Sequence, residues 1–195
     1  MIYITVLLTI AYFSIDELGD FQVVVRPMIT YLTLLFVFPI YRFVLPEVAV
    51  CVREKRFDEV QKIKSWLTKM SLWISGVFFI TMVFASEPLV AWLFPEQYIK
   101  AAPVLMHFSM FFIFMMLNGY QLAYIKAHGY FTQSLMIRIL GIIVLVGTFY
   151  IYRLHTENVV AVILALGTGY LMMYLAAKWV ERRIKRLNNV NSIAS

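Results

Sequence analysis

The sequence predicts an all-α, polytopic transmembrane helix bundle of about six helices, and three features of the chain lead to this prediction. Of its 195 residues, 62% are hydrophobic and only 14% are charged, whereas a water-soluble domain is nearer half apolar and a quarter charged. Apolar runs recur along the chain, several of them near the ~20 residues that a helix needs to cross the hydrocarbon core of a bilayer. Basic residues gather in alternate connections between these runs, as they do in multi-pass membrane proteins.

Six expected spans follow one another along the chain, at residues 2–15, 23–41, 70–94, 103–125, 135–152 and 159–177. The first run is short for a crossing, and it lacks the basic start and the clear cleavage site of a signal peptide. We interpret it as the end of a helix that begins before Met1. Residues 1–182 are expected to form one helical membrane lobe, followed by a basic and polar tail at 183–195.

A polar stretch, FPEQYIKAAP, separates the third expected span from the fourth. Pro95 is expected to end one helix, and Pro103 suits the first turn of the next, where its missing N–H costs little. Irregular backbone is expensive inside hydrocarbon, so this stretch is expected to form a turn outside the membrane.

The positions of the basic residues predict the orientation of the chain. Alternate connections and their flanks hold fourteen of the 17 Lys and Arg residues: Arg42, Arg53, Lys55, Arg56, Lys62, Lys64, Lys69, Lys126, Arg138, Lys178, Arg182, Arg183, Lys185 and Arg186. The remaining connections hold Arg26, Lys100 and Arg153. The positive-inside rule therefore predicts a multi-pass protein of the inner (cytoplasmic) membrane, with the connector 47–69 and the C-terminus in the cytoplasm.

The connector 47–69 has an amphipathic pattern of its own. Phe57, Val60, Ile63 and Leu67 recur every three or four residues between charged positions. This spacing predicts a helix lying on the inner leaflet, where it would hold anionic lipid. The alternative is a solvated elbow between two spans.

Two stretches of the chain resemble the oligosaccharide flippases, the polysaccharide-export transporters of the multidrug/oligosaccharidyl-lipid/polysaccharide superfamily. LVAWLFPEQYIKAAPVLMHFSM, an apolar helix and QLAYIKAHGY are similar in order and spacing to the turns of that family's C-terminal lobe. The matching positions are Phe94, Tyr98, Ala101, Ala102, Val104, Leu105, Ala127 and Gly129. Upstream, ELGDFQVVVRPMITYLTLLFVFPIYRFVLPEVA looks like the family's preceding turn, helix and exit.

This resemblance implies a fold of two lobes around a central cavity, in which the chain is approximately the C-terminal lobe. It implies a flippase that moves a lipid-linked oligosaccharide or polysaccharide precursor across the membrane by alternating access. The implied partners are that glycolipid, membrane lipids, and either a missing N-terminal lobe or a second copy of the chain.

Arg26 is the first candidate substrate-binding residue. A phosphate or diphosphate head group needs a shielded, cationic route through the membrane, and an ionised side chain that persists inside a span usually faces a cavity. Arg26 lies a few residues inside the second expected span, next to Pro27, and its guanidinium could hold phosphate oxygens in a fork. In the alternative, Arg26 reaches to the outer interface, toward Asp20.

The fourth and fifth spans supply the other candidates. Asn118, Gln121 and Tyr124 follow one another at spacings of three, so they share a helix face that could offer amides and a hydroxyl to a sugar. The alternative is hydrogen bonding between helices of the bundle. Lys126 and Arg138 are expected at the cytoplasmic ends of adjacent helices, as lipid head-group anchors or as a gate for an incoming diphosphate.

No catalytic set is recognisable, so no enzyme activity and no cofactor are expected. The three histidines have no metal-ligand spacing, and the basic residues flank apolar spans, which favours membrane topology over nucleic-acid binding. Three alternative functions remain open. They are a cation-coupled multidrug exporter of the same superfamily, a membrane-embedded glycan-processing enzyme, and a non-transporting scaffold. The exporter is disfavoured because no Asp or Glu lies near the middle of an expected span.

Overall fold

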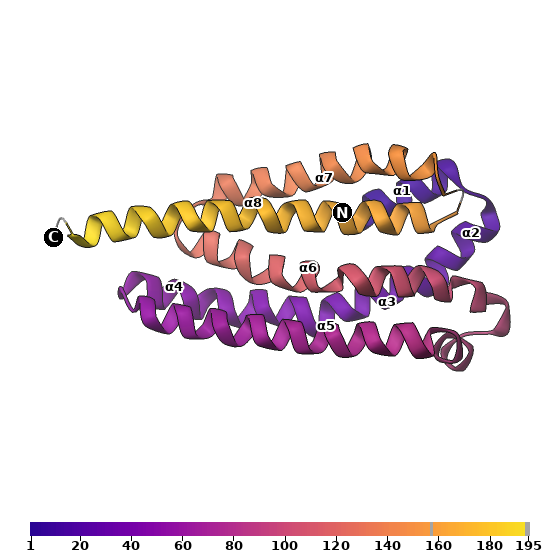
Figure 1. The fold of residues 1–195 in the computed structure, drawn as a ribbon, viewed down its shortest axis with the longest axis horizontal. Coiled ribbons are helices and arrows are strands. Elements are labelled where there is room, and N and C mark those ends of the chain that lie inside the picture. Colours follow the sequence, from indigo (N-terminus) through magenta and orange to yellow (C-terminus); the bar gives the residue numbers. More distant parts are fainter. Residues whose placement is uncertain (157, 194–195) are drawn as a thin grey trace.

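Long apolar helices run side by side in the computed structural model of the chain (Figure 1). The structure describes residues 1–156 and 158–193, and it describes the side chains of these residues except 41, 185 and 187–193. The α-helices in chain order are α1 (Ile2–Tyr12), α2 (Ile15–Asp20), α3 (Arg26–Leu32), α4 (Leu45–Arg53), α5 (Phe57–Leu93), α6 (Ala102–Ala127), α7 (Phe131–Arg153) and α8 (Val160–Ile193).

Five helical segments of the described chain are long and apolar enough to cross a membrane. They are Ile15–Arg53, Phe57–Leu93, Glu96–Ala127, Phe131–Arg153 and Val160–Ile184. A sixth helix, α1, is apolar but has only 11 residues, which is too short to cross the hydrocarbon alone. The prediction of an all-α transmembrane bundle with about six helices is confirmed, and the chain is a polytopic membrane protein.

The segment Ile15–Arg53 is one continuous helix because its prolines are accommodated by π-helical turns. Such turns cover Phe21–Val25, Thr33–Val37 and Ile40–Val44, each within a few residues of Pro27, Pro39 or Pro46. Proline has no N–H to donate, and its ring clashes with the carbonyl of the residue four positions earlier. A wider turn relieves that clash without ending the helix.

The connector 47–69 differs from its prediction. Residues 57–69 are the first turns of α5, which continues through the apolar span to Leu93, so they do not form a separate helix on the leaflet. Val60 and Leu67 are buried against Val48 and Cys51 of α4 and other residues of the same core cluster. The amphipathic pattern therefore reflects packing inside a helical hairpin.

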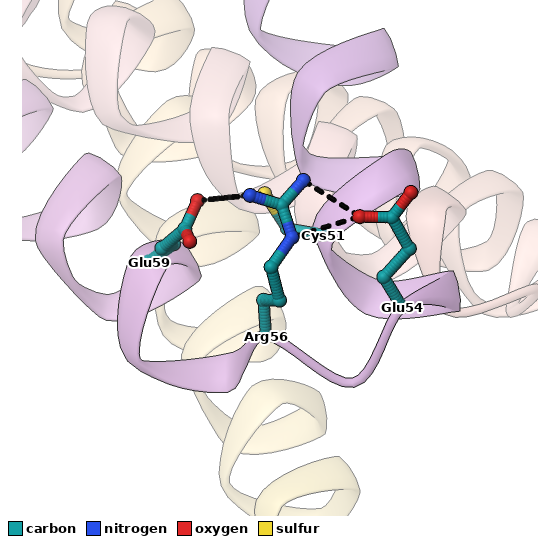
Figure 2. A network of polar contacts seen from close by, with 4 residues as sticks. All are labelled: Cys51, Glu54, Arg56 and Glu59. Atoms are coloured by element: carbon teal, nitrogen blue, oxygen red, sulfur yellow. Dashed lines mark hydrogen bonds and ion pairs between the residues drawn. The ribbon is translucent and has the colours of Figure 1, made fainter.

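Arg56 closes the turn of this hairpin (Figure 2). Its guanidinium donates to Glu54 Oε2 from Nε at 2.8 Å, and to Glu59 Oε2 from Nη1 at 2.5 Å. Lys55 between them has φ +59°, a left-handed conformation that is uncommon for a residue with a side chain. The two ion pairs hold the end of α4 to the start of α5, although exposed pairs of this kind add little stability.

The connections alternate between the two ends of the bundle, as predicted. The α4–α5 turn, the α6–α7 turn and the C-terminus lie at one end, and the connections after α1, α5 and α7 lie at the other (Figure 1). We call the first of these the basic end, because the residues near it include Lys55, Lys126, Arg182 and Arg183.

Helix α6 is the centre of the bundle, and it packs against α4, α5, α7 and α8. Phe108 and Phe112 are buried on it and meet Phe78 of α5, with ring centroids 6.4 and 5.2 Å away. Helices α7 and α8 approach closely where Gly169 faces Gly141. A Cβ atom on Gly169 would lie 2.8 Å from the Gly141 carbonyl oxygen, so the absence of a side chain sets this distance.

Replacing Gly169 with Val is expected to force α7 and α8 apart and to lower the free energy of unfolding by about 1–3 kcal/mol, the usual cost of overpacking. Thermal unfolding in detergent, followed by circular dichroism, measures the change. Gly147→Val is the matched control, because a Cβ at Gly147 would meet nothing within 4 Å. Equal melting temperatures for the two variants would contradict this account of α7–α8 packing.

Candidate functional site

Arg26 lies in an open hollow on the outside of the helix Ile15–Arg53. The hollow has a volume of about 330 Å³ and is lined by Gln22, Arg26, Pro27, Thr30 and Tyr31. Arg26 Nη1 donates to Gln22 Oε1 at 2.8 Å, one helical turn away. Tyr31 is 63% exposed, so this face of the helix is not covered by the rest of the bundle.

The charge of Arg26 is not neutralised by a neighbouring acid. Within residues 1–156 and 158–193 no carboxylate forms a salt bridge with Arg26. Asp20, which the sequence offered as its partner, pairs instead with Lys100 Nζ at 3.5 Å. Arg26 therefore presents an unpaired guanidinium about one turn inside the apolar part of a membrane span, and an anion is the group that would complete it.

Asn118 and Arg138 lie in a different place, between α6, α7 and α8. Both line a cavity of about 520 Å³, together with Tyr3 and Thr33. Asn118 Nδ2 donates to the Tyr170 carbonyl oxygen of α8 at 2.8 Å, which is the interhelical hydrogen bond that the sequence left as the alternative. Its Oδ1 atom is buried and has no hydrogen-bond partner among the described residues.

Lys126, Gln121 and Tyr124 complete the set of predicted residues. Lys126, in the last turn of α6, is close enough to Arg138 for the two charges to repel each other. Gln121 and Tyr124 are buried in the bundle, and neither lines the cavity. Tyr124 packs on His128, with ring centroids 4.3 Å apart, and Gln121 Oε1 has no hydrogen-bond partner among the described residues.

The six predicted residues thus form two groups rather than one site. Arg26 is alone near the end of the bundle opposite the basic end, on an uncovered surface. The other five, Asn118, Gln121, Tyr124, Lys126 and Arg138, occupy the half of α6 and α7 nearest the basic end (Figure 1). A ligand that contacted Arg26 and also the five residues near the basic end would have to move along the length of the bundle.

A buried ion pair between Lys64 of α5 and Glu181 of α8 was not predicted from the sequence. Lys64 Nζ donates to Glu181 Oε1, and the Glu181 side chain is only 4% exposed. Glu181 falls on the buried stripe of α8 that includes Met173, Ala177 and Ile184. The sequence did carry a signal for this ion pair. Glu181 lies within an apolar stripe of helical spacing, and a carboxylate buried there needs a basic partner.

The carboxylate of Glu181 also acts on the turn between α6 and α7. Burial lowers the pKa of His128 below its usual 6.5, while a hydrogen bond to the Tyr124 carbonyl and the charge of Glu181 oppose that shift. His128 is therefore neutral at pH 7. Gly129, which follows it with φ +83°, takes the left-handed conformation that reverses the chain into α7.

Comparisons of the chain with protein-family models, with curated proteins and with solved structures find no match. The flippase resemblance therefore stays a prediction. In the part of the chain that the structure describes, no group of three or more His, Cys, Asp or Glu residues could hold a metal ion.

Lys64→Met is expected to lower the free energy of unfolding by about 3 kcal/mol, because it removes the ammonium that faces a buried carboxylate. Denaturant unfolding in detergent measures the loss. Lys69→Met, an exposed position on the same helix, should change little. The double variant Lys64→Met/Glu181→Met should recover most of the stability, since neither charge is then buried. A double variant as unstable as the sum of its two single variants would show that the pair contributes nothing.

Proposed function

We propose that this chain is one lobe of a transporter that moves a lipid-linked oligosaccharide across the inner membrane by alternating access. The observation that supports this most directly is the guanidinium of Arg26, which no acid among the described residues neutralises and which lies in an open hollow on an uncovered face of a membrane-spanning helix. An ionised side chain inside a membrane span is costly where it faces lipid, so this face is better suited to a hydrated, protein-lined route than to lipid alone.

A second lobe, or a second copy of the chain, would enclose that face. The residues beyond the hollow on the same segment are large, apolar and exposed, among them Leu34, Leu35 and Phe38. Covered by a partner, they would form the wall of a central cavity with Arg26 inside it. Rocking of two lobes about such a cavity is a common mechanism in transporters.

The chemistry of the hollow suits a sugar phosphate. A guanidinium holds phosphate oxygens in a planar fork, which an ammonium does not. Gln22 offers an amide, while Thr30 and Tyr31 offer hydroxyls within the same hollow, and sugar hydroxyls need such neutral donors and acceptors. Arg26 would therefore bind the diphosphate, and its neighbours would contact the first sugar.

The second group of residues would meet the head group where it enters. Arg138 and Lys126 lie toward the basic end, which the positive-inside rule assigns to the cytoplasm. Two neighbouring cations there attract an anionic head group from the cytoplasmic leaflet, and Arg138 also lines the adjoining cavity.

The multidrug exporter is the less favoured function. Such a pump needs a carboxylate that is available to bind protons or sodium. Glu181 is the only buried Asp or Glu among the described residues, and it is paired with Lys64. Its charge is thus already compensated by an ammonium.

Arg26→Gln is expected to weaken binding of a polyprenyl diphosphate oligosaccharide by about 10–100-fold, which corresponds to loss of a charged hydrogen bond of roughly 1.5–3 kcal/mol. Binding to the full chain in nanodiscs can be measured by native mass spectrometry, with the same oligosaccharide on an uncharged polyprenyl chain as the comparison ligand. Only the diphosphate should bind tightly.

Two controls make this result specific. Arg42→Gln removes the same charge from an exposed position outside the hollow and should bind normally. Arg26→Lys should bind with intermediate affinity, because it keeps the charge and loses the fork. Equal affinity for the charged and the uncharged glycolipid would count against a flippase. Binding only of a lipophilic cation such as tetraphenylphosphonium would also count against it and would favour the exporter.

The orientation can be tested with single cysteines at Lys55 and Gln97, which are exposed at opposite ends of the bundle. In a Cys51→Ser background, a membrane-impermeant maleimide added to intact spheroplasts should label the cysteine at 97 and spare that at 55. Permeabilisation should expose both. Labelling of position 55 from outside would reverse the predicted topology.

A further inference from the structure

A small groove lies at the basic end, between the start of α7 and the stretch of α8 from Trp179 to Ile184. It has a volume of about 190 Å³ and is lined by Tyr130, Gln133, Trp179, Val180, Arg183 and Ile184. These residues do not overlap with those that line the cavity beside Asn118 or the hollow around Arg26. The groove is therefore a separate feature that the proposed transport function does not use.

The groove lies at the depth of the lipid head groups. The apolar part of α8 gives way to charged residues from Lys178 onward, and the helix continues past the α6–α7 turn (Figure 1). Trp179 is 63% exposed beside it, and Tyr130 lies on the opposite wall. Tryptophan and tyrosine are enriched at this boundary, where one part of the ring contacts acyl chains and the other contacts polar head groups.

Arg183 makes the groove cationic. Its Cζ atom lies 6.0 Å from the centroid of the Trp179 ring, one helical turn away, so the guanidinium is held at the rim. Among the described residues it forms no salt bridge. Its nearest acid in sequence, Glu181, is buried and paired with Lys64 on α5. Lys178, Arg182 and Arg186 are exposed on the same helix and add positive charge.

We propose that this groove binds an anionic phospholipid in the leaflet at the basic end. The Arg183 guanidinium holds the lipid phosphate, and the Gln133 amide donates to a second head-group oxygen. One acyl chain lies against Val180 and the exposed ring of Trp179. The lipid thereby joins the start of α7 to the middle of the second half of α8, outside the substrate route.

Quenching of Trp179 by brominated lipids tests this directly. The chain has four tryptophans, so Trp66, Trp73 and Trp92 are replaced with Phe, and the protein is reconstituted in vesicles of phosphatidylcholine with phosphatidylglycerol. In one set of vesicles the phosphatidylglycerol carries bromine on its acyl chains, and in the other the phosphatidylcholine does. The two brominated lipids are present at the same mole fraction. We expect stronger quenching by the brominated phosphatidylglycerol, which reports its enrichment at the groove.

Arg183→Gln should abolish that preference, with a relative affinity for phosphatidylglycerol about tenfold lower. Arg182→Gln is the matched control, because it removes the same charge from the adjacent residue, which does not line the groove, and it should keep the preference. Equal quenching by both lipids would overturn the proposal. An equal loss in the two variants would also overturn it, because diffuse charge would then account for the enrichment.

Native mass spectrometry provides a second measurement that needs no tryptophan substitution. The otherwise unaltered chain should retain phosphatidylglycerol in preference to phosphatidylcholine, and Arg183→Gln should lose this preference while Arg182→Gln retains it. Retention that is the same in all three proteins would overturn the proposal even if the single-tryptophan protein failed to fold.

Discussion

Hydrocarbon offers no hydrogen bonds to a peptide backbone, and this constraint determines most of the structure. Every N–H and C=O group within the membrane needs a partner inside the protein, so the candidate spans of the described chain are helices and its irregular turns lie at the two ends. The prolines within the spans work against this requirement. Pro27, Pro39 and Pro46 are accommodated by π-helical turns, and Pro88 by non-helical dihedral angles at Ala85, three residues earlier. The helix Ile15–Arg53 continues through the first three, whereas α5 is kinked at Ala85.

Sequence reasoning predicted the fold class well because the constraint acts on composition and length, which a sequence displays directly. The helix boundary at Phe94, the proline at the start of α6 and the alternation of the connections all agree with the structure. The connector 47–69 was expected to be a helix on the leaflet or a solvated elbow, whereas in the structure residues 57–69 begin α5 and pack against α4. Its apolar spacing is the same whether the helix packs on lipid or on a neighbouring helix, and the sequence does not say which.

The candidate site was less predictable, because it depends on which helices are neighbours. Asn118 was expected either to bind a sugar or to bond another helix, and it bonds Tyr170 of α8 while also lining a cavity. The Lys64–Glu181 pair joins residues 117 positions apart, and no local pattern specifies such a contact. The sequence alone identified Arg26 as a candidate, because a charged residue inside an apolar span is uncommon. Its isolation from Asp20 depends on where Lys100 lies in three dimensions.

The π-helical turns also have a geometric consequence for the hollow around Arg26. Each residue of an α-helix turns the chain by about 100°, and a π-helical turn takes in one residue more than an α-helical turn. Resolving the turn at Phe21–Val25 into regular α-helix would swivel everything on one side of it by roughly that angle relative to the other. Arg26 directly follows this turn. Rewinding these five residues would therefore turn the Arg26 guanidinium to a different face of the helix Ile15–Arg53.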